Sequence, residues 1–218
     1  MDSTNAQVTI NKGSLVVFVS AVSEQTQSDV LISTLFAQLA ADKKFDRENA
    51  TYDWYRQYNQ VLATLGWDGG SFDPRSWESS NDSFTMDEVI LEIAAASLTG
   101  VQSQAVAAVL KQLTRLPKTD GRLGEFYREA HSQRRGNFQI AVCTELDGLV
   151  FLQDMSFIFE TEDEVTDLLS FRFSSGKTKM QTAVQARTLN LQLFAMSRDT
   201  TVRKLGGNIA SFTRPLHL

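Results

Sequence analysis

The chain is poor in the residues that build covalent and metal-bound scaffolds, with one cysteine and two histidines among its 218 residues. A lone cysteine excludes an internal disulfide, and so few thiol and imidazole groups exclude the usual zinc sites. No run of about 18 apolar residues exists, so no transmembrane helix is predicted. The polar start, residues 1–5, carries no basic segment. We therefore expect a protein made in the cytoplasm and, if exported, exported without a classical signal peptide.

Positive charge is also scarce, since 21 Lys and Arg stand against 26 Asp and Glu, a net charge of −5. This balance predicts no nucleic-acid partner. Fourteen Phe, three Pro and 42% hydrophobic residues are typical of a folded chain. The length suits one domain with a sizeable core, and no Pro- or Ser-rich linker divides it. We expect a single domain over residues 1–218.

The first part of the chain, about residues 23–135, is predicted to be helical after one N-terminal strand. A β-branched apolar run over residues 15–22 predicts that strand. Apolar residues then recur at helical spacing, which predicts helices over 29–40, 54–65, 85–98, 103–116 and 123–132. Thr85 and Glu88 form a capping box, and Gly66 is placed to end the second helix. The loop 67–83 carries Trp67 and Trp77, which are either pinned on the core or part of a partner-binding loop; pinning is favoured.

The second part, about residues 136–218, is predicted to be rich in β-structure because its apolar period changes to two. Asp147-Gly148 predicts a two-residue type I′ hairpin that pairs Leu146 with Leu149. That register places six side chains on one face: Phe138, Ile140, Val142, Phe151, Met155 and Phe157. A strand is also expected at 169–173 with 180–186 as its hairpin partner. Residues 189–193 fit a strand or a helix, with the strand favoured; 199–205 predict a short helix and 209–212 a last strand.

The expected fold is α+β, with an N-terminal strand and a helical layer that packs on one face of a C-terminal antiparallel meander. Cys143 points to the opposite face, beside Ala141, Val150 and Leu152, so that face is apolar as well. A second apolar face either lines a lipid-sized cavity or is covered by other elements. Cys143 itself is either a small buried hydrophobe, the favoured reading, or a point of lipid attachment or ligand contact.

No catalytic signature stands out. Residues 175–178 hold only the end of a phosphate-binding loop pattern. His131 near Cys143, or the terminal His217, could serve a nucleophile, but no protease motif surrounds either. The acidic residues between Glu160 and Asp167 lack the spacing of a calcium loop, which favours a solvated loop over a metal site. Lys111, Arg115 and Lys118 fall about one helical turn apart and form a basic face, either an ordinary solvated surface or a docking site for an acidic partner.

Two stretches carry a family resemblance. They are DVLISTLFAQLAADKKFD at residues 29–46, and WYxxY followed by VLATLGW within residues 54–67. Together they resemble the Evf-type virulence factors of bacteria. The resemblance implies a mixed α/β protein that acts on a host without catalysis and carries a lipid-modified cysteine. Cys143 is then the only residue that could bear the lipid, and its neighbours match no motif of that family.

The leading hypothesis is a non-enzymatic, toxin-like or virulence-associated effector that binds a membrane surface or a protein partner. It needs no cofactor and no metal. Two alternatives belong to other classes. One is a hydrolase or transferase whose site is built from scattered carboxylates and hydroxyls. The other is a homo-oligomeric structural or immunity protein that buries its second sheet face against a copy of itself.

Overall fold

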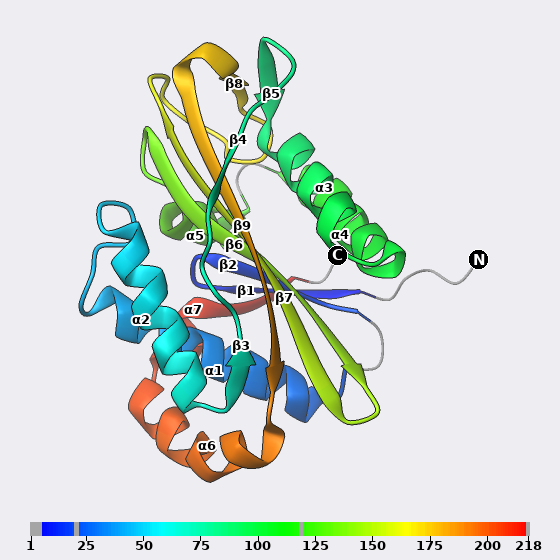
Figure 1. Ribbon diagram of the computed structural model, residues 1–218, viewed down its shortest axis with the longest axis vertical. Coiled ribbons are helices and arrows are strands. Elements are labelled where there is room, and N and C mark those ends of the chain that lie inside the picture. The colour runs from blue at the N-terminus through cyan, green and yellow to red at the C-terminus, as the bar shows by residue number, and fades with distance from the viewer. Residues whose placement is uncertain (1–5, 20–21, 118–119, 217–218) are drawn as a thin grey trace.

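The computed structural model describes residues 6–19, 22–117 and 120–216. A mixed sheet in the order β10-β1-β2-β6-β7-β9-β3 forms its centre, with β4 also paired to β9, while β5 and β8 make a separate small sheet (Figure 1). The strands are β1 (Gln7–Asn11), β2 (Ser14–Phe18), β3 (Trp67–Gly69), β4 (Arg75–Trp77), β5 (Ser83–Thr85), β6 (Arg135–Leu146), β7 (Leu149–Thr161), β8 (Arg172–Ser174), β9 (Thr178–Leu189) and β10 (Thr213–Leu216). The helices are α1 (Glu24–Asp42), α2 (Thr51–Thr64), α3 (Met86–Ser97), α4 (Gly100–Leu113), α5 (Gly121–Ala130), α6 (Leu191–Leu205) and α7 (Asn208–Phe212).

Helices cover both faces of the sheet, as Figure 1 shows. On one face α3, α4 and α5 pack against a core that includes Phe138 and Phe157. On the other, α1, α2 and α6 pack against a core that includes Cys143 and Leu152. The fold is α+β as predicted, and helices also cover the second apolar face, which is one of the two alternatives that the sequence left open for it. Both faces of the sheet are apolar, and each must be shielded from water. Both cores pack against the same sheet. The single domain over residues 1–218 stays a prediction.

The long β6–β7 hairpin has the predicted register. Leu146 pairs with Leu149, and Phe138 pairs with Phe157. Asp147 and Gly148 have φ values of 51° and 76°, the positive values that a type I′ turn requires. Local turn chemistry and side-chain alternation therefore fixed this part of the fold.

The N-terminal strand prediction was incomplete. The predicted strand 15–22 is β2, which ends at Phe18, and residues 20–21 lie outside the described residues. Before it comes β1, which pairs antiparallel with β2. β2 in turn pairs parallel with β6, so the sheet is not a pure antiparallel meander.

Three predictions for the C-terminal part were wrong. Residues 180–186 are not a hairpin partner of 169–173: β8 pairs with β5, whereas β9 pairs with β7 over its whole length. Residues 191–193 are helical, because Asn190 caps α6 by accepting from the backbone N–H of Leu193 at 3.0 Å. Residues 209–212 belong to α7, and the edge strand is the following β10, paired with β1.

The helix predictions were mostly confirmed, with shifts of a few residues at the ends. α1 begins earlier than expected because Ser23 caps it, and α4 begins at Gly100 after the cap Thr99. The capping box of α3 is confirmed, with Glu88 Oε2 accepting from Thr85 N at 2.8 Å. Among the described residues, no helix has both the length and the apolar character needed to cross a bilayer.

Candidate functional site

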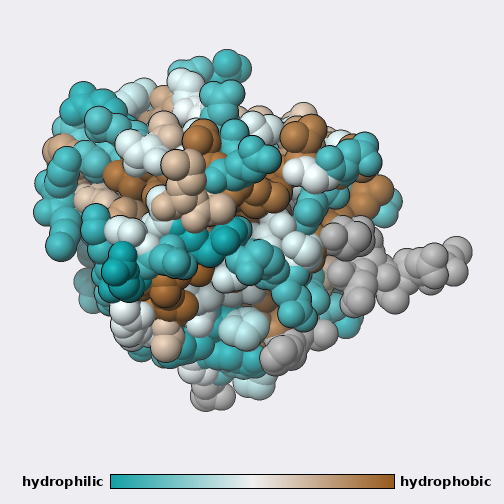
Figure 2. Space-filling view, turned by 90° about the horizontal axis from the view of Figure 1, so that it is seen from below, coloured by the Kyte–Doolittle hydropathy of each residue, from teal (hydrophilic) through white to brown (hydrophobic). Residues whose placement is uncertain are grey.

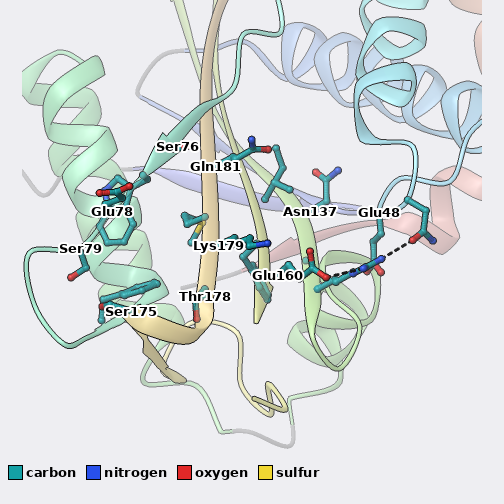
Figure 3. Close-up of a pocket in the computed structure, with 18 residues that line it drawn as sticks. Glu48, Ser76, Glu78, Ser79, Asn137, Glu160, Ser175, Thr178, Lys179 and Gln181 are labelled. Atoms are coloured by element: carbon teal, nitrogen blue, oxygen red, sulfur yellow. Dashed lines mark hydrogen bonds and ion pairs between the residues drawn. The ribbon is translucent and has the colours of Figure 1, made fainter. Parts of the chain in front are cut away.

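A groove of about 700 Å³ opens where β6 begins, β7 ends and β9 begins (Figure 3). Two cross-strand rows of the sheet contribute to its lining: Arg135, Glu160 and Lys179 in one, and Asn137, Ile158 and Gln181 in the next. Other lining residues come from β4 and the residues after it, and from the segment before α2. This volume lies within the range of small-molecule sites. The sheet therefore supplies much of the lining of an open site whose surface is polar and apolar in about equal parts.

Two of the charged side chains in the groove, Arg135 and Glu160, form an ion pair with each other. Arg135 donates to Glu160 Oε1 and to Asn49 Oδ1, each at 2.8 Å (Figure 3). The hydrogen bond between Arg135 and Glu160 lowers the pKa of the carboxyl and raises the pKa of the guanidinium. Glu48 accepts from the backbone and hydroxyl of Ser132. These bonds fix the wall on the α2 side.

A buried polar cluster lies under α2, on the face of the sheet that α1, α2 and α6 cover. Asp154 on β7 and Arg187 on β9 are 1% and 3% exposed, and Asp154 Oδ2 lies 3.6 Å from Arg187 Nη2. Gln139 donates to the same Asp154 oxygen at 3.2 Å. From α2, Asn59 accepts from Arg187 at 3.2 Å and donates to Gln185 at 2.9 Å. The cluster thus joins the helix to the centre of the sheet.

Burial controls the proton affinities in this cluster. It raises the pKa of Asp154 to about 6, against the opposing charges of Arg187 and Arg47. It also raises the pKa of Tyr55 to about 12, and that of Tyr58 still further. Both phenols are therefore neutral at physiological pH. Four of the buried side-chain atoms that lack a hydrogen-bond partner in the described part of the chain belong to this cluster: Asp154 Oδ1, Ser156 Oγ, Gln185 Nε2 and Arg187 Nε.

Cys143 lies on the predicted face, and helices cover it. Its side chain is fully buried in the core that also contains Ala141, Val150 and Leu152. Burial raises the pKa of the thiol to about 12, so the thiolate that attacks electrophiles is scarce. In the homo-oligomer alternative, a second copy of the chain was expected to cover this face of the sheet. Helices of the same chain cover it instead.

The two tryptophans of the 67–83 segment are held against the fold, as the pinned interpretation predicted. Trp67 is 3% exposed, and its indole N–H donates to Ser33 Oγ at 3.0 Å. Trp77 is half-buried, and it lines the groove. Much of the segment runs beside β9 as the short strands β3 and β4.

The other sequence candidates lie on separate elements where the structure describes them. Lys111 and Arg115 are exposed at the end of α4, and Lys118 lies outside the described residues, as does His217. His131 ends α5, with Nδ1 2.8 Å from the carbonyl oxygen of Ser132. Asp163 pairs with Lys177. Within the described part of the chain, no cluster of three or more His, Cys, Asp or Glu is arranged to hold a metal ion.

One end of the molecule exposes large apolar side chains, which we call the apolar end: Leu146, Leu149, Leu193 and Met196, exposed by 66%, 56%, 54% and 84%. The first two flank the β6–β7 turn, and the others lie on α6. They share one end of the sheet because Val150 pairs with Leu189, the last residue of β9, and α6 begins just beyond it. Figure 2 looks onto this side and shows hydrophobic residues at the surface among polar ones.

Helix α6 is oriented by an ion pair with α1. Arg198 donates to both carboxylate oxygens of the fully buried Asp29, at 2.7 and 2.6 Å. On the exposed side, Leu193, Met196, Thr200 and Arg203 recur at helical spacing, followed by the exposed Lys204. The sequence predictions missed this surface because 189–193 was assigned to a strand. The three-and-four spacing from Leu193 onward was the signal that could have revealed it.

No protein-family model matches the chain, and no curated protein matches it. Solved structures do resemble it. A delta-endotoxin has a TM-score of 0.46 and 12% identity, over 88% of this chain and 82% of that one. Activated Cyt2Ba from Bacillus thuringiensis subsp. israelensis has a TM-score of 0.41 and 10% identity, over 83% and 98%. The Evf virulence factor has a TM-score of 0.36 and 14% identity, over 97% and 85%. The proteins similar in structure thus include the virulence factor that the sequence resembles.

Proposed function

We propose that this protein is a non-enzymatic, toxin-like effector that acts by binding a membrane surface through its apolar end. The observation that carries the proposal is the exposure of four large apolar side chains on two elements, the β6–β7 turn and α6, that lie at the same end of the sheet. Large apolar side chains gathered at one exposed end of a protein are typical of an interaction site. The toxin-like role is the one that the sequence resemblance implies.

The chemistry of α6 favours a lipid surface as the partner. Apolar Leu193 and Met196 lie on the same exposed side as Arg203, with Lys204 next to it. A helix that combines apolar and cationic residues in this way can lie in the lipid interface, with its apolar side chains among the acyl chains and its cations at anionic headgroups. The turn residues Leu146 and Leu149 would add a second apolar contact.

The test is sedimentation with vesicles of phosphatidylcholine alone and of phosphatidylcholine with phosphatidylserine. The wild-type protein should sediment with vesicles, and more strongly when phosphatidylserine is present. The double variant Leu193→Glu/Met196→Glu should lose affinity by about tenfold or more, because two large apolar side chains no longer leave water. Arg203→Glu should reduce only the increment due to phosphatidylserine.

A matched control keeps the result interpretable. Val101 on α4 is 56% exposed and does not belong to the apolar end. Val101→Glu places a negative charge at a comparable exposed apolar position outside the apolar end, so it should leave vesicle binding unchanged. Equal losses in both variants, or no sedimentation with either vesicle, would count against the proposal.

Lipid attachment at Cys143 stays a prediction from the sequence resemblance. The thiol is buried between helices and sheet, so an acyl chain would have to enter the core beside Leu152 or displace a covering helix. Intact-mass measurement of protein from its native host would detect the added mass, and Cys143→Ser should remove it. An unmodified mass in the wild type would contradict the prediction while leaving the apolar end untouched.

A further inference from the structure

We propose that acid strengthens the binding of the apolar end to a membrane, because the β6–β7 turn enters the lipid interface more readily when the carboxyl of Asp147 is protonated. This inference rests on the proposed function and concerns its regulation. Asp147 lies in the turn between two leucines of the apolar end, Leu146 and Leu149, which are 66% and 56% exposed. A titratable group is thus placed inside the surface that is proposed to contact lipid.

The geometry of the turn keeps this carboxyl close to the apolar contact. Leu146 pairs directly with Leu149, so Asp147 and Gly148 alone form the connection between the two strands. Consecutive Cα atoms are only about 3.8 Å apart. Apolar side chains of a protein at a lipid interface are buried by about 5 to 10 Å. The Asp147 carboxyl therefore reaches the interface together with the two leucines.

The fold does not neutralise the carboxylate at this tip. Among the described residues, the Asp147 side chain makes no hydrogen bond and no ion pair, and it is exposed. A Cβ added at Gly148 would meet no atom within 4 Å, so the turn projects away from the other elements. The preceding carboxylate, that of Glu145, is already engaged, because it accepts from the backbone N–H of Ser23 at 3.1 Å.

Other charged groups lie on the elements at this end of the sheet. Arg198 and Asp29 form an ion pair with each other at 2.6 Å. The remaining charged groups at this end are Glu145 on β6, Glu24 on α1, Asp68 on β3, and Asp199, Arg203 and Lys204 on α6. Several of these carboxylates are protonated in acid as well, so a change of pH alone does not isolate Asp147.

The direction of the effect follows from the cost of removing a charge from water. An ionised carboxylate is more costly to bring to a membrane than a protonated carboxyl, so the bound state favours the protonated form. The protein then takes up a proton on binding, and its affinity rises as pH falls. Lowering the pH from about 7 to about 4.5 should strengthen binding to uncharged vesicles by about tenfold.

The test is flotation of the intact protein with phosphatidylcholine vesicles at these two pH values, because aggregated protein does not float. Vesicles without net charge remove the general attraction between an acidified protein and anionic lipid. Asp147→Asn removes the titrating group and keeps the turn, since Asn-Gly is also preferred in type I′ hairpins. At about pH 7 this variant should bind about tenfold more tightly than the wild type, and it should lose most of the pH dependence.

The matched control is Asp82→Asn. Asp82 is an exposed aspartate just before β5, which lies at the far end of the molecule from the β6–β7 turn (Figure 1). This control should bind like the wild type at both pH values. Equal flotation of the wild type at both pH values, or the wild-type pH dependence in Asp147→Asn, would overturn this inference and leave the apolar end in place. No flotation of either protein at either pH would overturn the proposed function as well.

Discussion

Asp154 and Arg187 lie on the neighbouring strands β7 and β9, with Oδ2 and Nη2 3.6 Å apart, and both side chains are 1% exposed. Arg187 also donates to Asn59 on α2, and its guanidinium lies 5.7 Å from the centre of the Tyr58 ring on the same helix. A buried pair of charges therefore sits where the helix meets the sheet. Such a pair is costly to desolvate, and it leaves a large penalty if one partner is removed.

The first prediction concerns pH. Burial raises the pKa of Asp154 in the folded protein to about 6, above its ordinary value of 3.8. The folded state therefore holds this proton more tightly than the unfolded state does. The stabilisation that Asp154 contributes is fully present below about pH 4 and is lost as pH rises through about 6.

Asp154→Asn removes this titration. The difference in free energy of unfolding, wild type minus variant, should fall by on the order of 3 kcal/mol between pH 4 and pH 7. Urea unfolding at several pH values measures it. Because Asp120, with a pKa lowered to about 2 by its hydrogen bond to Arg122, titrates equally in both proteins, it cancels from the difference. A constant difference across this range would show that Asp154 does not titrate as described.

The second prediction concerns the charge pair itself. Arg187→Met leaves the Asp154 carboxylate buried without its ion-pair partner and should destabilise the protein by about 3 to 5 kcal/mol near pH 7. The double variant Asp154→Leu/Arg187→Met removes both charges and should recover most of that loss. Chemical denaturation of the two variants checks it. If the double variant is less stable than the single one, the pair is not the source of the penalty.

The third prediction concerns the two cores. Trp54 in one core and Phe157 in the other are fully buried, so replacing either with Ala should cost about 3 to 5 kcal/mol through lost burial and a cavity. Thr85→Ala removes only the cap of α3 and should cost about 1 kcal/mol. Thermal melts compare the three variants. A larger loss for Thr85→Ala than for Trp54→Ala would contradict the assignment of Trp54 to the core.

The fourth prediction compares two glycines. Gly124 lies inside α5, and a Cβ added there would meet no atom within 4 Å, so Gly124→Ala should stabilise the protein by about 0.5 to 1 kcal/mol. Gly69 has a φ of +87°, and an added Cβ would lie 2.7 Å from the carbonyl oxygen of Ala186. Gly69→Ala should therefore destabilise the β3–β9 contact. Shifts in melting temperature of opposite sign are expected, and shifts of the same sign would disprove the comparison.

Features with short-range signals could be predicted from the sequence. Three such features depend on residues close together in the chain: the buried apolar face of α2, the capping box at Thr85 and the pairing of Leu146 with Leu149. The predicted register even placed Asp154 opposite Ala141, on the same face as Cys143. That polar residue on an apolar face was the available sign of the buried cluster, and the prediction described only its apolar neighbours.

Features made by distant residues could not be predicted. The buried carboxylate of Asp29 looks, in sequence, like an ordinary residue at the start of a helix, and its partner Arg198 is 169 positions away. The groove likewise joins residues from segments far apart in the chain, including Glu48, Trp77, Arg135, Glu160 and Lys179. No spacing within the chain brings these side chains together.

By itself, the sequence determined which residues share a face of each strand and helix, because side-chain direction follows directly from the backbone period. It also determined the turn that sets the central hairpin. Only the tertiary structure decided that helices shield both faces of the sheet, that Asp154 meets Arg187 beneath α2, and that α6 and the hairpin turn expose their apolar residues at one end. The reason is physical: periodicity says that a face must be buried, whereas the covering element is selected by packing between segments far apart in the chain.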